Sequence, residues 1–131
     1  MICSTFPKSN AGIRSGDFCF VHRADGRVAL FVYLFARPKT RSSFFGALAT
    51  TVLPHARIEG IPAKLTLGDH ALLHIKCFRE NNTPVAGNVL DRIDAEVLDA
   101  KKAEAFSYVV GSSTLVWGYR TIVARANAIP A

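Results

Sequence analysis

Residues 16–36 read GDFCFVHRADGRVALFVYLFA, and this stretch decides the fold. Two apolar runs, 18–21 and 28–36, flank the dipeptide Asp25-Gly26. A two-residue hairpin of type I′ needs positive φ at both turn positions, and Asp-Gly is a favoured pair there. The second run is rich in β-branched and aromatic side chains, which fit a pleated sheet. The stretch therefore predicts two antiparallel strands joined at Asp25.

Neither apolar run alternates with polar residues, so we expect both faces of the hairpin to be covered, as in the core of a barrel or sandwich. The run 44–53 fits one helical face, but its threonines and Val52 favour a strand. Glycine, proline and asparagine punctuate the rest of the chain. Further strands are predicted at 70–78, 85–90 and 114–123, followed by a short, frayed tail.

One helix is predicted, over residues 91–107. Asp91 fits its N-cap, and Asp94 and Glu96 place negative charge near the first turn, where the helix dipole favours it. Several strands with one late helix indicate the α+β class. We expect a strongly bent antiparallel sheet or a partly open SH3-like barrel, with the helix covering one end. The whole chain, 1–131, is expected to be a single domain.

The composition is that of a folded, basic protein. The chain has 131 residues, of which 50% are hydrophobic and 20% charged, enough to bury a core without disulfides. Its formal net charge is +6 and its pI about 9.6. Such a charge favours acidic partners, which include nucleic acid, an anionic membrane surface and acidic proteins, although a small surplus also simply keeps a domain soluble.

The cysteines predict a reduced protein. Cys3, Cys19 and Cys77 are odd in number and form no CxxC pair, so no disulfide framework or zinc site is indicated. Cys19 and Cys77 lie in apolar runs and are expected to be inert and buried. Free thiols fit the cytoplasm. Residues 1–12 lack the apolar core of a secretory signal, and 28–36 is too short to cross a membrane, so no membrane partner is expected.

No catalytic or metal pattern is specific. His70 and His74 are expected on a strand, where they lie too far apart to bind one ion directly. Cys19 has no sign of activation by His22 or His55. The glycines form no phosphate-binding pattern, so no cofactor is expected. The acidic residues of the predicted helix are interpreted as a solvated face; they are Asp91, Asp94, Glu96 and Asp99.

The candidate partner-binding residues are basic: Arg37, Lys39, Arg41, Arg57 and Lys64. The first three lie in one loop, where they either face solvent or form the rim of an interface. Four aromatic residues offer stacking surfaces for single-stranded nucleic acid if they are exposed. Burial in the core is the favoured interpretation, because aromatic side chains bury large apolar areas. They are Phe44, Phe45, Trp117 and Tyr119.

The chain opens with IRSGDFCFV at 13–21, ADGR at 24–27 and an apolar strand. This opening resembles a family of bacterial immunity proteins from polymorphic-toxin systems, often called immunity protein 26. The stretch ALLHIKCFRENNTPVAGN at 71–88 is similar to a later strand, polar turn and return. This chain lacks the family's tryptophan before Val85 and adds the helix 91–107. The same opening is also typical of small SH3-like barrels.

The resemblance implies a non-catalytic, cytoplasmic protein that binds a cognate toxin domain and blocks it. Charge complementarity would favour an acidic toxin surface. The alternative from the residues alone is a small nucleic-acid-binding β-barrel, because of the net charge and the loop at 37–41. A third function is a small enzyme or ligand carrier with a pocket under the bent sheet.

Overall fold

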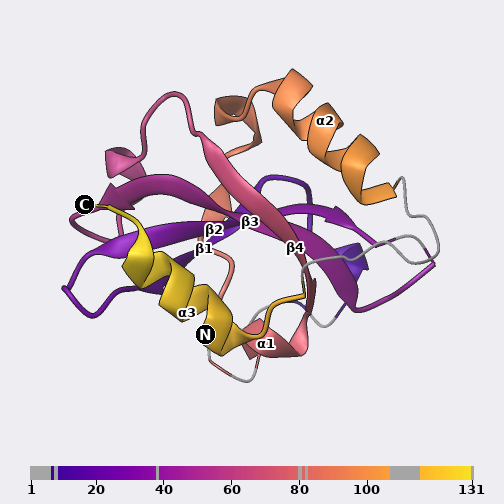
Figure 1. Ribbon diagram of the computed structural model, residues 1–131, viewed down its shortest axis with the longest axis horizontal. Helices are drawn as coiled ribbons and strands as arrows, with labels where there is room; N and C mark the ends of the chain where they lie inside the picture. The colour runs from indigo at the N-terminus through magenta and orange to yellow at the C-terminus, as the bar shows by residue number, and fades with distance from the viewer. Residues whose placement is uncertain are drawn as a thin grey trace.

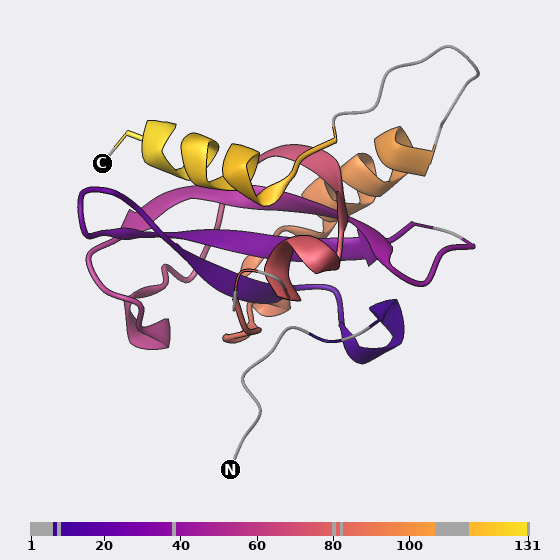
Figure 2. The same cartoon turned by 90° about the horizontal axis from the view of Figure 1, so that it is seen from below.

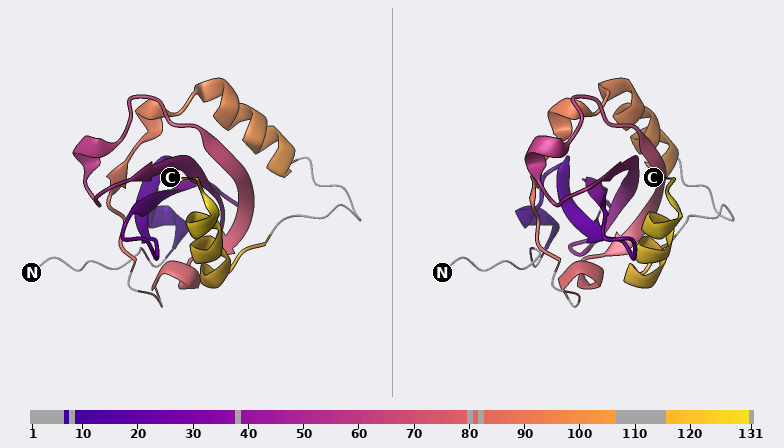
Figure 3. Two further views of the ribbon diagram at one scale, coloured as in Figure 1. Left: turned by 60° about the vertical axis from the view of Figure 1, so that its left-hand side comes forward. Right: turned by 90° about the vertical axis from the view of Figure 1, so that its left-hand side faces the viewer.

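The computed structural model describes residues 7, 9–37, 39–79, 81, 83–106 and 116–130. An open, five-stranded antiparallel sheet with the order β4-β3-β2-β1-β5 forms its centre (Figure 1). The sheet is strongly curved (Figure 3). The predicted α+β class and bent antiparallel sheet are therefore confirmed. The strands are β1 (Asp17–His22), β2 (Val28–Ala36), β3 (Ser43–Leu53), β4 (Leu67–His74) and β5 (Gly87–Asn88).

The β1–β2 hairpin forms as predicted, but its turn has another geometry. The Gly26 N–H donates to the Arg23 carbonyl at 3.2 Å, and the Arg23 N–H donates to the Arg27 carbonyl at 2.9 Å. Gly26 has a φ of 84°, whereas Asp25 does not have a positive φ. This is a three-residue loop, in which a glycine in the left-handed region follows a type I turn. The prediction of a type I′ turn was therefore wrong, although Asp25-Gly26 marked the position correctly.

Both faces of the hairpin are covered, as predicted. The first eight residues of β2 are all buried, and the side chains of the first seven alternate between two apolar clusters. Phe31 and Tyr33 belong to the first cluster, or first core, on what we call the first face of the sheet. Leu30, Val32 and Leu34 belong to the second cluster, or second core, on the second face. Alternation arises because successive side chains of a strand point to opposite faces. The sheet thus has a core on each side.

Different elements cover the two faces. Helix α3 (Tyr119–Ala128) lies along the first face (Figure 2), and the short helix α1 (Lys76–Arg79) contributes Phe78 there. The second face is covered by α2 (Ala95–Phe106) through Leu98 and by segments around the 3₁₀ turns η2 (Ile58–Gly60) and η3 (Leu90–Arg92). A third such turn, η1 (Asn10–Gly12), precedes β1.

The C-terminal segment differs most from the sequence prediction. The predicted strand over 114–123 and frayed tail are wrong for the residues described there, because α3 occupies 119–128. Tyr119, Ile122, Val123 and Ala126 have helical spacing, and all four pack against the first cluster. The burial of this stripe favours the helix over a strand.

The hairpin turn holds the end of α3. The Arg23 guanidinium donates to the Ala126 carbonyl at 3.0 Å and to the Ile129 carbonyl at 2.7 Å. It also forms an ion pair with Asp25 at 2.8 Å. Carbonyls at a helix C-terminus lack partners within the helix, and a cation there satisfies them.

Two further boundaries move. Helix α2 begins at Ala95 rather than at 91, because 90–92 form η3 and the Asp94 carboxylate accepts the Glu96 N–H at 2.8 Å. Asp94 is thus the N-cap in place of Asp91. β4 ends at His74, where the sequence predicts a strand to Phe78.

None of the helices in the described part of the chain combines the length and apolar character needed to span a membrane.

Candidate functional site

The five predicted partner-binding residues lie at the two ends of β3. Arg37, Lys39 and Arg41 are exposed in the loop before β3, and Arg57 and Lys64 are exposed in the connection after it. β3 has 11 residues, so its ends lie about 30 Å apart. The structure therefore brings the first three residues together and places the other two elsewhere.

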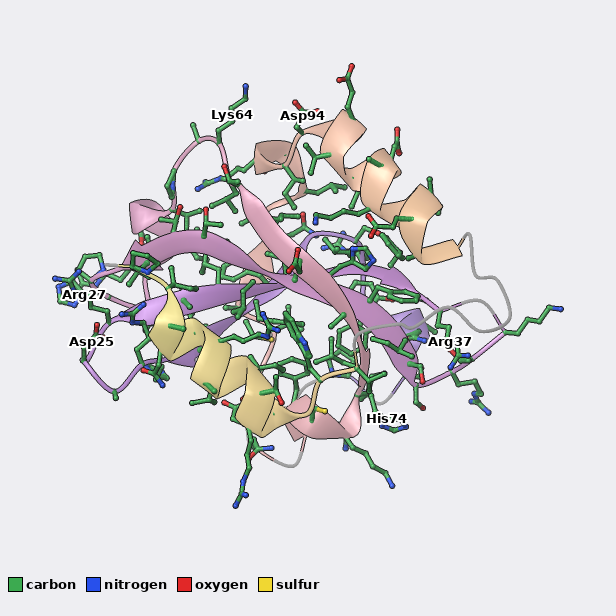
Figure 4. The ribbon with its side chains drawn as sticks, in the orientation of Figure 1. Asp25, Arg27, Arg37, Lys64, His74 and Asp94 are labelled. Atoms are coloured by element: carbon green, nitrogen blue, oxygen red, sulfur yellow. The ribbon has the colours of Figure 1, made fainter. Side chains whose placement is uncertain are left out.

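Lys64 has a different environment from the loop cations. It lines a cavity of about 400 Å³ between α2 and residues 64–67, together with Asp94 and Lys101. Figure 4 shows Lys64 near Asp94 and away from Arg37. The Asp94 carboxylate reduces the positive potential around Lys64.

Three segments that are distant in sequence meet at the end of the sheet where Arg37 lies. The Asn10 N–H donates to the Arg41 carbonyl at 2.8 Å, which attaches the residues before β1 to the β2–β3 loop. The Ile75 N–H donates to the Ser42 carbonyl at 2.8 Å, which attaches the start of α1. Main-chain hydrogen bonds therefore fix the relative positions of all three segments.

These contacts gather exposed cations into one surface, which we call the basic end. The described residues of segments 9–14, 37–42 and 74–79 contain no carboxylate, and the Asp17 carboxylate that accepts the Arg14 N–H at 2.8 Å is buried. Like charges gathered on one face sum to a positive potential that attracts acidic partners. The basic end consists of Arg14, Arg37, Lys39, Arg41 and Lys76, all exposed.

The β2–β3 loop is held in one conformation. The Thr40 hydroxyl donates to the Arg37 carbonyl at 2.8 Å, and the Asn10 side-chain amide donates to the Ser43 carbonyl at 2.8 Å. The Thr40 N–H also donates to the Arg37 carbonyl, at 3.3 Å, which closes a four-residue turn. Lys39, at the third position of this turn, has a φ of 63°. A non-glycine residue costs roughly 1–2 kcal/mol in this left-handed region.

The histidines of β4 do not form a metal site. His70 and His74 both lie on the strand, as predicted. Among the described residues, no group of three or more histidine, cysteine, aspartate or glutamate side chains is placed to hold an ion. Burial, with a further contribution from Lys101, lowers the pKa of His70.

Cys19 is buried in the first apolar cluster, as predicted. Burial and the charge of Asp17 raise the pKa of its thiol to about 12, so the thiolate needed of a nucleophile is scarce at neutral pH. Cys77 lies in α1 rather than in a strand and is half-buried. Cys3 lies outside the described residues.

The aromatic side chains pack in the core, as favoured from the sequence. Phe44, Phe45 and Trp117 expose 0%, 4% and 5% of their surface, which leaves no face for a stacked base. Tyr119 is half-buried. The Arg125 guanidinium covers the Trp117 ring at 4.7 Å from its centroid. The four acidic residues predicted to form a solvated face are exposed on and before α2.

Sequence reasoning missed Arg14 and Lys76 because contacts between distant segments, not local sequence, bring them to the basic end. Ser43 pairs with His74 across β3 and β4, and this pairing places α1 beside the β2–β3 loop. A correct alignment of β3 with β4, two strands that are distant in sequence, would have been needed to find it. Comparisons of the chain with family models, with curated proteins and with solved structures found no match. The candidate surface is therefore defined by the geometry of the chain's own residues.

Proposed function

We propose that the chain is a non-catalytic binding protein whose basic end captures an acidic surface of a partner protein. The observation that carries this proposal is the left-handed backbone conformation of Lys39. Its strained backbone occupies a turn position where glycine fits without strain, and its side chain is exposed. Strain of this kind is common where a structure presents a residue for function.

The fixed loop supports binding for a second reason. Ordering a flexible loop on association costs free energy, whereas the β2–β3 loop already holds Arg37, Lys39 and Arg41 in place. Exposed cations at an interface mainly accelerate association and add salt dependence. The basic end is therefore suited to rapid capture of an acidic partner.

The partner's class follows from the resemblance of residues 13–36 and 71–88 to immunity proteins. On this proposal the partner is a toxin domain, and the chain neutralises it in the cytoplasm by direct binding. The free thiols of Cys19 and Cys77 support such a compartment.

Nucleic acid binding is the second candidate function, and the basic end is the observation that favours it. Binding would have to use phosphate contacts, because Phe44, Phe45 and Trp117 are buried. Such binding weakens steeply as salt rises. The shortage of stacking surfaces favours the protein partner over single-stranded nucleic acid.

The test compares charge reversal at the two ends of β3. Arg37→Glu, Lys39→Glu and Arg41→Glu are combined in one variant, and Lys64→Glu alone is the control. The immobilised protein is exposed to an extract of the cells that produce it, and bound proteins are quantified. We expect one stoichiometric partner, lost from the first variant and retained by the control. Recovery of no partner, or equal loss in both variants, contradicts the proposal.

A short duplex and a single strand of DNA and RNA are titrated in parallel at low salt. We expect no saturable binding by the wild-type protein. Binding that disappears in the triple variant and survives in the control would transfer the function to nucleic acid.

Lys39→Gly separates strain from binding. Glycine adopts positive φ freely, so we expect the free energy of unfolding to rise by up to about 1 kcal/mol while partner binding weakens. Chemical denaturation and the capture assay measure the two effects. A variant that binds as well as the wild type would show that Lys39 has no role in recognition.

A further inference from the structure

β1 is longer than the strand that pairs with its outer edge. β5 pairs with Asp17 and Phe18, whereas β1 continues to His22. Phe18 directs its carbonyl to this edge, where the Ala86 N–H donates to it at 2.8 Å. Main-chain groups alternate between the two sides of a strand, so Phe20 and His22 direct theirs to the same edge. Among the described residues no strand pairs with them there.

The chain before β5 turns away from this edge. The Thr83 N–H donates to the Phe78 carbonyl at 3.0 Å, which draws the segment towards α1. Pro84 has no N–H and is unable to extend a ladder. A cavity of about 220 Å³ lies between the segment and β1. It is lined by Phe20, His22, Ala56, Asn81, Thr83, Pro84, Ala86 and Tyr119.

The cavity combines apolar walls with polar groups. Thr83 is 5% exposed, and its hydroxyl lies 3.2 Å from the Tyr119 hydroxyl. The exposed side chain of His22 also lines the cavity. Among the described sequence neighbours of the lining residues, Arg57 and Arg120 are exposed cations, and none is a carboxylate. The two exposed cations favour a ligand that carries negative charge.

We propose that this edge binds an extended peptide segment of a partner protein, with an acidic side chain, as an additional strand beside β1. The peptide's main chain pairs with the N–H and C=O groups of Phe20 and His22. One of its side chains enters the cavity. Addition of a strand to an open edge is a recurrent mode of peptide recognition, in which main-chain bonds give affinity and a pocket gives selectivity.

The size of the cavity favours a peptide over a small molecule. Sites for drug-sized ligands usually enclose roughly 300–1,000 Å³, and this cavity is smaller. Open edges in native sheets are usually shortened or covered. The outer edge of β4 is covered in this way. The Lys101 ammonium donates to the Gly68 carbonyl there, and the Trp117 N–H donates to the Leu72 carbonyl. No such cover is present beside Phe20 and His22 in the described residues.

The proposal is independent of the basic end, because His22 pairs with Val28 at the far end of β2 from Arg37. The experiment titrates ¹⁵N-labelled protein with the capped peptide Thr-Val-Thr-Glu-Thr-Val-Thr in millimolar excess. We expect saturable shifts of the Phe20 and His22 amide signals. A peptide methylated on alternate backbone nitrogens should not bind, and a peptide with Lys in place of Glu should bind more weakly. Absence of shifts with the Glu peptide overturns the proposal.

Two substitutions at one position separate main-chain pairing from side-chain contact. His22→Pro removes the N–H that faces the open edge. Proline is accepted at such positions, because no partner strand inside the protein uses that N–H. His22→Ala removes the imidazole and keeps the N–H. We expect the first to weaken peptide binding roughly tenfold and the second to have a smaller effect. Equal losses overturn strand addition, and if His22→Pro fails to fold, the methylated peptide decides alone.

Discussion

Gly46 lies on β3 where the sheet leaves no room for a side chain. A Cβ atom there would lie 2.5 Å from the Phe31 ring and 3.0 Å from the Val32 carbonyl oxygen. Phe31 is 2% exposed and packs against Phe44 and Phe78, so its ring has little space to move. The absence of a side chain at Gly46 is therefore part of the packing of the first core.

Gly46→Ala should lower the free energy of unfolding by about 1–3 kcal/mol, because overpacking forces the ring or the backbone to shift. Gly60→Ala is the control, since no atom lies within 4 Å of a Cβ there. It should change stability by less than about 0.5 kcal/mol. Urea denaturation measures both variants, and equal effects would contradict the close contact at Gly46.

Two buried groups near Asp17, the Cys19 thiol and the Tyr33 hydroxyl, predict that the protein loses stability at alkaline pH. Burial, with the charge of Asp17, raises the pKa of Cys19 to about 12 from an ordinary 9.0. The same causes raise the pKa of Tyr33 to about 12 from 10.0. The folded chain therefore keeps both protons at pH values where the unfolded chain releases them.

A state that holds its protons longer is disfavoured relative to the unfolded state as pH rises. Stability should be independent of these groups below about pH 8 and fall between pH 9 and 12. Denaturant midpoints across this range measure the slope. Cys19→Ala and Tyr33→Phe should each reduce it. If the slope is unchanged in both variants, Cys19 and Tyr33 are not the cause of the alkaline loss of stability.

At the level of elements, the N-cap of α2 was predicted at Asp91 and lies at Asp94. Both residues are aspartates close to the start of the helix, so local sequence favours either as the cap. The choice is made by tertiary structure. The Leu65 N–H donates to the Arg92 carbonyl at 2.8 Å, and Ile93 is 8% exposed in the second core. These contacts hold 90–93 outside the helix.

Asp94→Ala should cost about 1 kcal/mol of stability, because the Glu96 N–H loses its acceptor at the helix N-terminus. Asp91→Ala removes the same charge from an exposed position and should cost at most a few tenths of a kcal/mol. Thermal denaturation followed by circular dichroism measures both. A larger loss for Asp91→Ala would restore the helix start predicted from sequence.

The elements that sequence predicted correctly are those whose signal is local. The β1–β2 hairpin has its turn dipeptide between two apolar runs, and β3 has Pro54 directly after its end. α3 was missed because Trp117, Tyr119 and Val123 also fit a strand period. The burial of Ile122 and Ala126, which favours a helix, depends on the distant first face of the sheet.

The candidate site shows the same division. Arg37, Lys39 and Arg41 were identified together because five consecutive positions contain all three. Arg57 and Lys64 were grouped with them by charge alone, and the length of β3 separates them. The left-handed conformation of Lys39 has no sequence signal, since this turn position usually selects glycine.

For the whole molecule, positive and negative charges lie on different parts of the surface, and this separation does not follow the division into two cores. The basic end lies at one end of β2 and β3, whereas Asp91, Asp94, Glu96 and Asp99 lie on and before α2 over the second face. An acidic partner would therefore be repelled from α2 while it is attracted to the basic end. This asymmetry orients the approach, and its effect should weaken with salt.

The two cores share the backbone of β2, and this predicts that they unfold together. Leu34 is 0% exposed in the second core, and Leu73 is 2% exposed in the first. Replacing either by alanine should cost about 2–5 kcal/mol, because each leaves a cavity among packed side chains. Trp117, the chain's one tryptophan, lies in the first core and reports on it by fluorescence.

Leu34→Ala tests whether damage to one core reaches the other. If the sheet is one cooperative unit, its fluorescence midpoint in urea falls by as much as its circular dichroism midpoint, although Leu34 and Trp117 lie in different clusters. Leu73→Ala is the matched variant within the cluster of Trp117, and its two midpoints should also coincide. Separate midpoints for Leu34→Ala would mean that the faces unfold independently and that 1–131 is not a single folding unit.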